Sequence, residues 1–215
     1  MAAVKQHPII IAGCGPGSPD FLAPTVRRAV EGAEVLVGAR RLLDLFPESA
    51  AEKIAVGADV EQALRAIDER RSDKKIVVLV TGDPGLCSLA RPVVDRFGRD
   101  ACLVIPGVSS VQAAFARLGL DWTDARIIDA HREDPAAVPE GLRGVAKIAV
   151  LAGRQEAFRW VAGLAEAVGE GYRIYACEDL TLPGERVREV GKKDLDVLRF
   201  SPRCVVLFLR EDVLR

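Results

Sequence analysis

The sequence predicts an α/β protein with two domains, a mostly parallel sheet in the N-terminal half and a mixed sheet in the C-terminal half. Residues 76–80, IVVLV, are an unbroken and largely β-branched run, which is typical of a strand covered on both faces. Strand-like and helix-like segments alternate up to residue 118, which favours parallel strands joined by right-handed crossovers. Near the C-terminus, three strand-like segments follow one another with only short helical stretches between them, which indicates a mixed sheet.

Hydrophobic periodicity predicts five strands and five helices in the first half of the chain. The strands are residues 8–12, 34–37, 53–56, 75–80 and 101–105. The first helix contains Val26 and Val30 at helical spacing and ends at Gly32. The other helices are residues 39–46, 58–71, 88–97 and 110–118. Pro47 and Gly119 mark the ends of the first and last of these four.

In the second half, the same patterns predict one long helix and five strands. The helix is residues 155–168, with apolar side chains on one face. The strands are residues 126–130, 147–151, 173–176, 185–190 and 204–209. Residues 131–144 are polar, contain proline and show little periodicity. This change in the pattern of strand-like and helix-like segments indicates a domain boundary near residues 107–120. We therefore expect domains at residues 1–110 and 111–215.

Composition and charge predict an ordinary protein of the cytoplasm. The 215 residues carry a formal net charge of −1, so nothing points to nucleic acid as a partner. No stretch of 18 consecutive apolar residues occurs and the N-terminus lacks the features of a signal peptide, so we expect no membrane association. The five cysteines are scattered singly and only two histidines occur, so we expect neither disulfides nor a metal site.

Three strands end in glycine-rich loops, and these loops are the first candidates for a ligand site. They are residues 9–18 (IIIAGCGPGS), 77–88 (VVLVTGDPGLCS) and 103–110 (LVIPGVSS). Open α/β sheets bind ligands at the carboxyl ends of parallel strands, so we expect the three loops to meet. The spacing of Gly13, Gly15 and Gly17 differs from the G-x-G-x-x-G dinucleotide fingerprint, which disfavours an NADP-dependent oxidoreductase. Arg40 and Arg41 keep that alternative open, since guanidiniums could hold its 2′-phosphate.

Each polar residue near these loops has both a structural and a ligand-binding interpretation. Asp83 could simply shape its turn, because Asp side chains bond neighbouring amides. Ser109 and Ser110 could cap a helix, or they could face an anionic or polar ligand at its N-terminus. His131 lies in a polar segment, and histidine is a common acid or base in catalysis, although a single His is more often structural. The dispersed arginines would suit a substrate that carries several carboxylates.

Four segments, in this order, resemble the tetrapyrrole methylase family. They are residues 12–43 (AGCGPGSPDFLAPTVRRAVEGAEVLVGARRLL), 78–85 (VLVTGDPG), 105–120 (IPGVSSVQAAFARLGL) and 176–187 (ACEDLTLPGERV). The resemblance covers nearly the whole chain. It implies an S-adenosylmethionine-dependent methyltransferase with two α/β domains and the active-site cleft between them.

Within the family, GARRLL, the GDPG loop and PGVSSVQAAFARLGLDWTDA resemble the members that methylate carbon-5 of a corrin precursor. The implied function is therefore in cobalamin biosynthesis, on a macrocycle of the precorrin-6B or cobalt-precorrin-6B type. These members typically read Ser-Leu-His-Gly-Arg where this chain has IDAHR at residues 128–132. The alternatives are a tetrapyrrole methylase for another ring position or for uroporphyrinogen, and a nucleotide sensor without turnover.

The resemblance also implies which residues form the site. The cofactor would contact Pro16, Thr81, Gly82, Asp83, Ser109, Ser110, Ala152 and Leu182. The tetrapyrrole would contact Gly15, Gly17, Arg40 and Arg132. His131 is the candidate base that removes a proton from the methylated macrocycle, and Asp83, Glu178 and Glu185 are alternatives.

Further implications concern the product and the partners. The cofactor product would be S-adenosylhomocysteine, and the chain would form a homodimer. In some family members a second module methylates carbon-15 and removes a carboxyl group. The short length of this chain predicts that such a C15-methyltransferase/decarboxylase is a separate partner protein.

Overall fold

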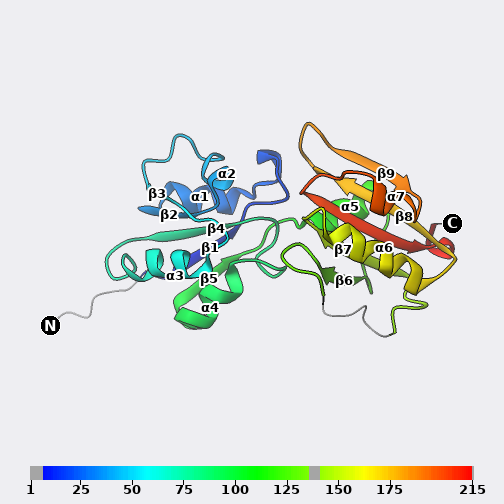
Figure 1. The fold of residues 1–215 in the computed structure, drawn as a ribbon. Coiled ribbons are helices and arrows are strands. Elements are labelled where there is room, and N and C mark those ends of the chain that lie inside the picture. Colours follow the sequence, from blue (N-terminus) through cyan, green and yellow to red (C-terminus); the bar gives the residue numbers. More distant parts are fainter. Residues whose placement is uncertain (1–6, 136–140, 215) are drawn as a thin grey trace. The chain divides into compact units, whose positions relative to one another are not determined.

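The computed structural model describes residues 7–135 and 141–214, which fall into two compact units, Met1–Ser109 and Ser110–Arg215 (Figure 1). We call them unit 1 and unit 2. Each unit contains a five-stranded sheet, wholly parallel in unit 1 and mixed in unit 2. The expected α/β class with these two kinds of sheet is therefore confirmed. The expected domain limits and the cleft between domains stay predictions.

The parallel strands of unit 1 lie in the order β3-β2-β4-β1-β5, so the strand before the GDPG loop is central. The strands are β1 (Ile9–Gly13), β2 (Val35–Gly38), β3 (Glu52–Ala55), β4 (Ile76–Val80) and β5 (Cys102–Ile105). The helices are α1 (Pro24–Glu31), α2 (Arg40–Leu43), α3 (Val60–Asp68) and α4 (Ala90–Phe97), with short 3-10 turns η1 (Pro19–Phe21) and η2 (Arg99–Ala101).

Alternate side chains of the unit 1 strands enter two separate cores, because successive strand residues point to opposite faces of a sheet. Ile76, Val78 and Val80 of β4 pack in one core with side chains of α3 and α4. Val77 and Leu79 pack in the other core with side chains of α1 and α2. The unbroken apolar run of β4 follows from this double burial, and all five of its residues are buried.

The sheet of unit 2 has the order β6-β7-β10-β8-β9. Strands β6 and β7 are parallel, whereas β10 runs antiparallel to both β7 and β8, and β9 antiparallel to β8. The strands are β6 (Arg126–Asp129), β7 (Lys147–Ala152), β8 (Tyr172–Glu178), β9 (Arg186–Val190) and β10 (Cys204–Arg210). The helices are α5 (Ser110–Arg117), α6 (Ala157–Val168) and α7 (Asp194–Val197), followed by the 3-10 turn η3 (Glu211–Leu214).

The core of unit 2 is built on the central strand β10. Phe158 and Val161 of α6 lie in one apolar cluster with Val206 and Phe208 of β10. Helix α5 also lies against β10. The ring of Phe158 stacks on that of Phe200, with centroids 4.2 Å apart. Ala152, a candidate site residue at the end of β7, belongs to the same apolar cluster.

Three elements differ from the sequence-based expectation. Strand β8 continues to Glu178 although the prediction ends it at residue 176, because arginines on β9 pair with that charge. Helix α2 is a single turn and ends well before Pro47. The turn α7 is too short for periodicity to reveal. Residues 136–140 of the polar segment lie outside the described residues.

Candidate functional site

The three glycine loops of unit 1 meet at the carboxyl ends of adjacent parallel strands, as the sequence predicts. Strand β1 lies between β4 and β5, so the loops that follow these strands are neighbours. The Gly82 N–H donates to the Gly15 carbonyl at 2.8 Å, and the Gly15 N–H returns a bond to the Gly82 carbonyl at 3.3 Å. Both glycines have positive φ, 74° at Gly15 and 64° at Gly82, a region that glycine enters without steric cost.

Close backbone packing explains why two more glycines stand where these loops meet. A Cβ on Gly13 would lie 2.7 Å from the Gly107 nitrogen and 2.8 Å from the Gly82 oxygen. A Cβ on Gly107 would lie 2.4 Å from that same oxygen. Real Cβ atoms essentially never come this close to backbone atoms, so a side chain at either position would push the loops apart.

Asp83 joins the second loop to the third. Its carboxylate accepts hydrogen bonds from the Gly85 N–H at 2.8 Å and from the Gly107 N–H at 3.1 Å. Charge-assisted bonds of this kind are stronger than neutral ones. Of the two interpretations of Asp83, shaping of the loop therefore has direct structural support.

Other residues of the unit 1 loops have less uniform surroundings. Thr81 is exposed, and the Arg41 guanidinium of α2 donates to its hydroxyl. Burial raises the pKa of the Cys14 thiol to about 12, against the opposing effect of the Arg41 charge. A thiol with such a pKa is not a nucleophile near neutrality, so Cys14 is a packing residue.

The remaining residues that the resemblance assigns to unit 1 and to the start of α5 differ in exposure. Pro16 and Ser109 are buried, whereas Arg40 is exposed on the first turn of α2. Ser110 is half-buried and opens α5. Gly17 is also half-buried and precedes the turn η1.

In unit 2, His131 lies beside the end of β7, where Ala152 is buried. The Ala130 N–H donates to the Leu151 carbonyl at 3.0 Å and extends the pairing of β6 with β7. A Cβ on Gly153 would lie 3.1 Å from the His131 Cβ, so this side chain packs against the glycine. The structure thus brings His131 and Ala152 to one edge of the unit 2 sheet. Arg132, the next residue, is exposed.

Asp129 orients His131, a contact that sequence reasoning missed. The Asp129 carboxylate accepts the backbone N–H of His131 at 3.0 Å and also pairs with its Nδ1. An imidazole whose Nδ1 donates to a carboxylate presents Nε2 as its proton acceptor. The signal in the sequence was an Asp two residues before a His at a strand end, which is too common a pattern to be specific.

Residues 179–185, here called the 179–185 loop, connect β8 to β9 and contain Leu182. The Leu182 N–H donates to the Asp179 carbonyl at 2.9 Å, and the Glu185 N–H donates to the Leu182 carbonyl at 2.9 Å. Asp179 and Thr181 have positive φ, 49° and 68°. Non-glycine residues in this region are strained, and such strain clusters at functional sites.

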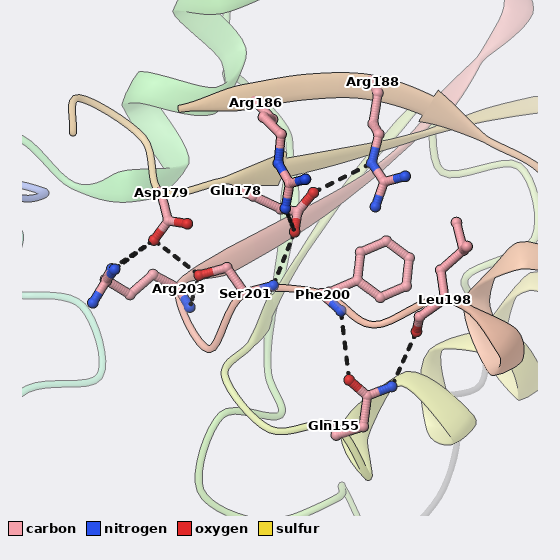
Figure 2. Close-up of polar contacts among 9 residues, drawn as sticks. All are labelled: Gln155, Glu178, Asp179, Arg186, Arg188, Leu198, Phe200, Ser201 and Arg203. Carbon is pink, nitrogen blue, oxygen red and sulfur yellow. Dashed lines mark hydrogen bonds and ion pairs between the residues drawn. The ribbon is translucent and has the colours of Figure 1, made fainter. Parts of the chain in front are cut away.

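Glu178, at the base of this loop, is fully buried and fully committed to structural contacts (Figure 2). Its carboxylate pairs with Arg186 at 3.1 Å and Arg188 at 3.3 Å, and it accepts the Ser201 N–H at 2.9 Å. These three contacts give the Glu178 carboxylate a structural role in unit 2. The alternative that Glu178 is the base stays a prediction.

The described residues show neither a metal site nor a membrane-spanning helix. Across residues 7–135 and 141–214, no three His, Cys, Asp or Glu side chains gather as a metal site would require, and no helix is long and apolar enough to cross a membrane.

A surface cavity of about 870 Å³ lies at the amino ends of β2 and β4, lined by Glu34, Phe46 and Lys74 among others. It is at the opposite edge of the sheet from the glycine loops.

Comparison with known proteins gives a consistent result. The family described as Tetrapyrrole (Corrin/Porphyrin) Methylases matches residues 8–196. The chain is 32% identical over 180 residues to the cobalt-precorrin-7 C(5)-methyltransferase of Salmonella typhimurium, with 83% of this chain and 88% of that protein covered.

Solved structures agree with this relationship. The precorrin-6Y methylase CbiE of Archaeoglobus fulgidus has a TM-score of 0.72 and 26% identity, with 95% of this chain and 98% of that chain covered. The uroporphyrin-III C-methyltransferase of Thermus thermophilus, solved with S-adenosylhomocysteine, has a TM-score of 0.76 over 94% of this chain and 96% of that chain. Its 22% identity shows a shared fold.

The family match spans most of the sequence, and the 32% identical relative is covered almost to its full length. The resemblance read from the four sequence segments is thereby confirmed, and with it the methyltransferase class. This chain belongs to the tetrapyrrole (corrin/porphyrin) methylase family.

Proposed function

We propose that the protein is an S-adenosylmethionine-dependent C-methyltransferase of cobalamin biosynthesis, acting on carbon-5 of a corrin macrocycle. The observation that carries this proposal is the 32% identity to the Salmonella cobalt-precorrin-7 C(5)-methyltransferase over 83% of this chain. The substrate stage in that name is cobalt-precorrin-7, and we adopt it here. The precorrin-6B stage expected from the sequence is the alternative, followed by methylation at another ring position.

The residues of the glycine loops suit the cofactor chemically. S-adenosylmethionine carries hydroxyl, amine and carboxylate groups, which hydrogen-bond to backbone groups and side-chain hydroxyls. The unit 1 loops supply backbone at Pro16, Gly82 and Asp83, and hydroxyls at Thr81 and Ser109. Ser110, Ala152 and Leu182 of unit 2 complete the proposed set. When bound, the cofactor supplies an electrophilic methyl group.

The chain's own residues have two tasks in this reaction. The first is alignment of a nucleophilic ring carbon with the methyl donor, and orientation of this kind contributes about 7–11 kcal/mol in favourable cases. We assign Gly15, Gly17, Arg40 and Arg132 to the macrocycle, because guanidiniums bind carboxylates in a two-pronged geometry.

The second task is removal of a proton. Methylation leaves the macrocycle with one positive charge, and loss of a ring proton restores a neutral conjugated system. We assign the acceptor role to Nε2 of His131. Asp129 supports this assignment, because a carboxylate on Nδ1 stabilises the imidazolium that forms.

The assembly and location follow the same resemblance. We propose that the protein is a homodimer of the cytoplasm. We also propose that a separate C15-methyltransferase/decarboxylase acts on the same macrocycle. Sedimentation velocity of the purified protein tests the first proposal, since a monomer at micromolar concentration would contradict it.

Titration calorimetry with S-adenosylhomocysteine tests the cofactor class directly. We expect binding with a dissociation constant below about 1 mM, an affinity of about 4 kcal/mol or more. NADPH, followed by its fluorescence, serves as the control ligand. Binding of NADPH with no binding of S-adenosylhomocysteine would contradict the proposal and favour an oxidoreductase.

A further inference from the structure

The 179–185 loop holds two non-glycine residues in the left-handed region of backbone conformation. Thr181 has a φ of 68° and Asp179 a φ of 49°. Thr is β-branched, so its presence there is less favourable than that of Gly or Asn. Such a backbone persists only when its surroundings hold it, and carboxylate contacts are found at both the tip and the base of this loop.

The Glu185 carboxylate connects the tip of the loop to helix α5. This carboxylate accepts the N–H of Thr181 at 2.5 Å, so it bonds directly to the backbone of the strained residue. The same carboxylate accepts hydrogen bonds from Nε and Nη2 of Arg117, the latter at 3.0 Å. Arg117 is the last residue of α5, which lies against β10. The Thr181 amide is thus tied through one carboxylate to a packed helix.

Charge reinforces this arrangement. The Arg117 guanidinium, as the main cause, holds the pKa of the Glu185 carboxyl below its ordinary value, and the Thr181 N–H adds to the effect. Glu185 is therefore ionised at neutral pH. An ionised acceptor makes a stronger bond to an amide than a neutral one does.

The base of the loop is held independently, as Figure 2 shows. The Asp179 carboxylate accepts from the Ser201 hydroxyl at 2.8 Å and from Arg203 Nε at 2.7 Å, and the Asp179 N–H donates to the Arg203 carbonyl. Glu178 is fixed by its two arginines and by Ser201. Removal of the Glu185 side chain would therefore remove its bond to the Thr181 amide and leave the contacts at the base in place.

We infer that Glu185 is a positioning residue, which holds Thr181 and Leu182 in the cofactor-binding conformation before the cofactor arrives. The inference rests on the proposed function, in which Leu182 contacts S-adenosylmethionine. A loop ordered in advance does not lose conformational freedom on binding, so its affinity for the ligand is higher. Glu185 thereby contributes to cofactor affinity without touching the reacting atoms.

The test compares Glu185→Ala and Glu185→Gln with Glu189→Ala. Glu189 is a matched control. Its carboxylate also accepts two hydrogen bonds from one arginine, Arg173, but it bonds to no residue of the 179–185 loop. We expect Glu185→Ala to weaken S-adenosylhomocysteine binding about tenfold, the loss expected when ordering of a few residues moves to the binding step. Glu185→Gln keeps an acceptor for the Thr181 amide, so its loss should be smaller. Glu189→Ala should bind like the original protein.

Kinetics and amide exchange separate positioning from general damage. The KM for S-adenosylmethionine should rise with the dissociation constant in Glu185→Ala, while kcat at saturation should change less than about twofold. Hydrogen exchange should be faster at the Thr181 amide of the ligand-free variant and slow again with S-adenosylhomocysteine bound. If Glu185→Ala does not fold, Glu185→Gln alone decides through the same readouts.

Two results would overturn the inference. One is equal affinity for S-adenosylhomocysteine in Glu185→Ala and Glu189→Ala. The other is equal protection of the Thr181 amide in the original protein and in Glu185→Ala, which needs no ligand. Failure of the original protein to bind S-adenosylhomocysteine would contradict the proposed function instead, and the exchange measurement would still judge the role of Glu185 in the loop.

Discussion

The glycine loops of unit 1 combine close backbone packing with the Asp83 carboxylate, whereas the strand ends of unit 2 are held by carboxylates that pair with arginines. In unit 1, Gly13 and Gly107 sit so close to the Gly82 carbonyl that no side chain fits. In unit 2, Glu178 and Glu185 pair with arginines and with backbone amides. Both constructions give fixed backbone at strand ends, but they respond differently to mutation and to pH.

The difference also revises the reason for glycine in unit 1. Glycine in a ligand loop is often explained by the close approach of the backbone to the ligand. The distances at Gly13 and Gly107 show a prior requirement, since their missing side chains let the three loops pack on one another. A glycine at a ligand loop can thus serve the loop itself, independently of the ligand.

The largest expected effect is a loss of stability when one methyl group is added to a glycine of the unit 1 loops. We expect Gly107→Ala to lower the free energy of unfolding by about 3 kcal/mol, because its Cβ would meet backbone that cannot move aside. Urea denaturation followed by circular dichroism measures this loss. Gly57→Ala is the matched control, since a Cβ there meets nothing within 4 Å. Equal stability of the two variants would contradict the claim that the unit 1 loops depend on close backbone packing.

A change of chemistry in unit 2 should act on rate and leave the fold intact. We expect His131→Gln to lower kcat about a hundredfold, within the usual contribution of a general base. Asp129→Asn should have a smaller effect and should change the pH dependence of kcat, since it alters the partner of Nδ1. Initial rates between pH 5.5 and 8.5 measure both. An unchanged kcat in His131→Gln would exclude His131 as the base.

Removal of the buried Glu178 carboxylate should lower the free energy of unfolding less than addition of a methyl group at Gly107. Glu178→Ala leaves the Ser201 N–H without its acceptor, while the arginines it pairs with can turn to water. We expect a loss of about 2 kcal/mol in the free energy of unfolding. Glu189→Ala, which breaks an exposed pair, should cost less than about 1 kcal/mol. A larger loss at Glu189 than at Glu178 would contradict this ranking.

The smallest expected effect is a pH dependence carried by Glu185. Its pKa is lowered in the folded protein, so the unfolded chain binds more protons as the pH falls, and stability falls with it. The contribution of Glu185 is complete above the ordinary carboxyl pKa of about 4.3 and is lost as the pH drops through the lower folded value. The Tm difference between the original protein and Glu185→Gln should shrink from pH 7 to pH 3.5. A constant difference would mean that charge plays no part.

The fold could be predicted well because its signals are local. The double-faced burial of β4 appears in the sequence as IVVLV, and the stop at Gly119 appears as a glycine with a φ of 67°. The meeting of the glycine loops also followed, since neighbouring parallel strands end at one edge of a sheet.

The contacts that hold the unit 2 loops could not be predicted. Glu178 looked like a loop residue or a base, because its arginine partners lie eight and ten positions away on another strand. The pairing of Glu185 with Arg117 joins residues 68 positions apart. Asp129 was overlooked for a different reason, since a neighbouring Asp and His carry no distinctive spacing.

Incubation with S-adenosylmethionine labelled with ¹³C in its methyl group, together with cobalt-precorrin-7, tests the central claim most directly. We expect the product to gain one labelled methyl group, with the ¹³C signal assigned by NMR to the substituent on carbon-5. His131→Gln, assayed in parallel, should give the same product more slowly. A labelled methyl group on any other ring carbon, or no transfer by the folded protein, would contradict the proposed function.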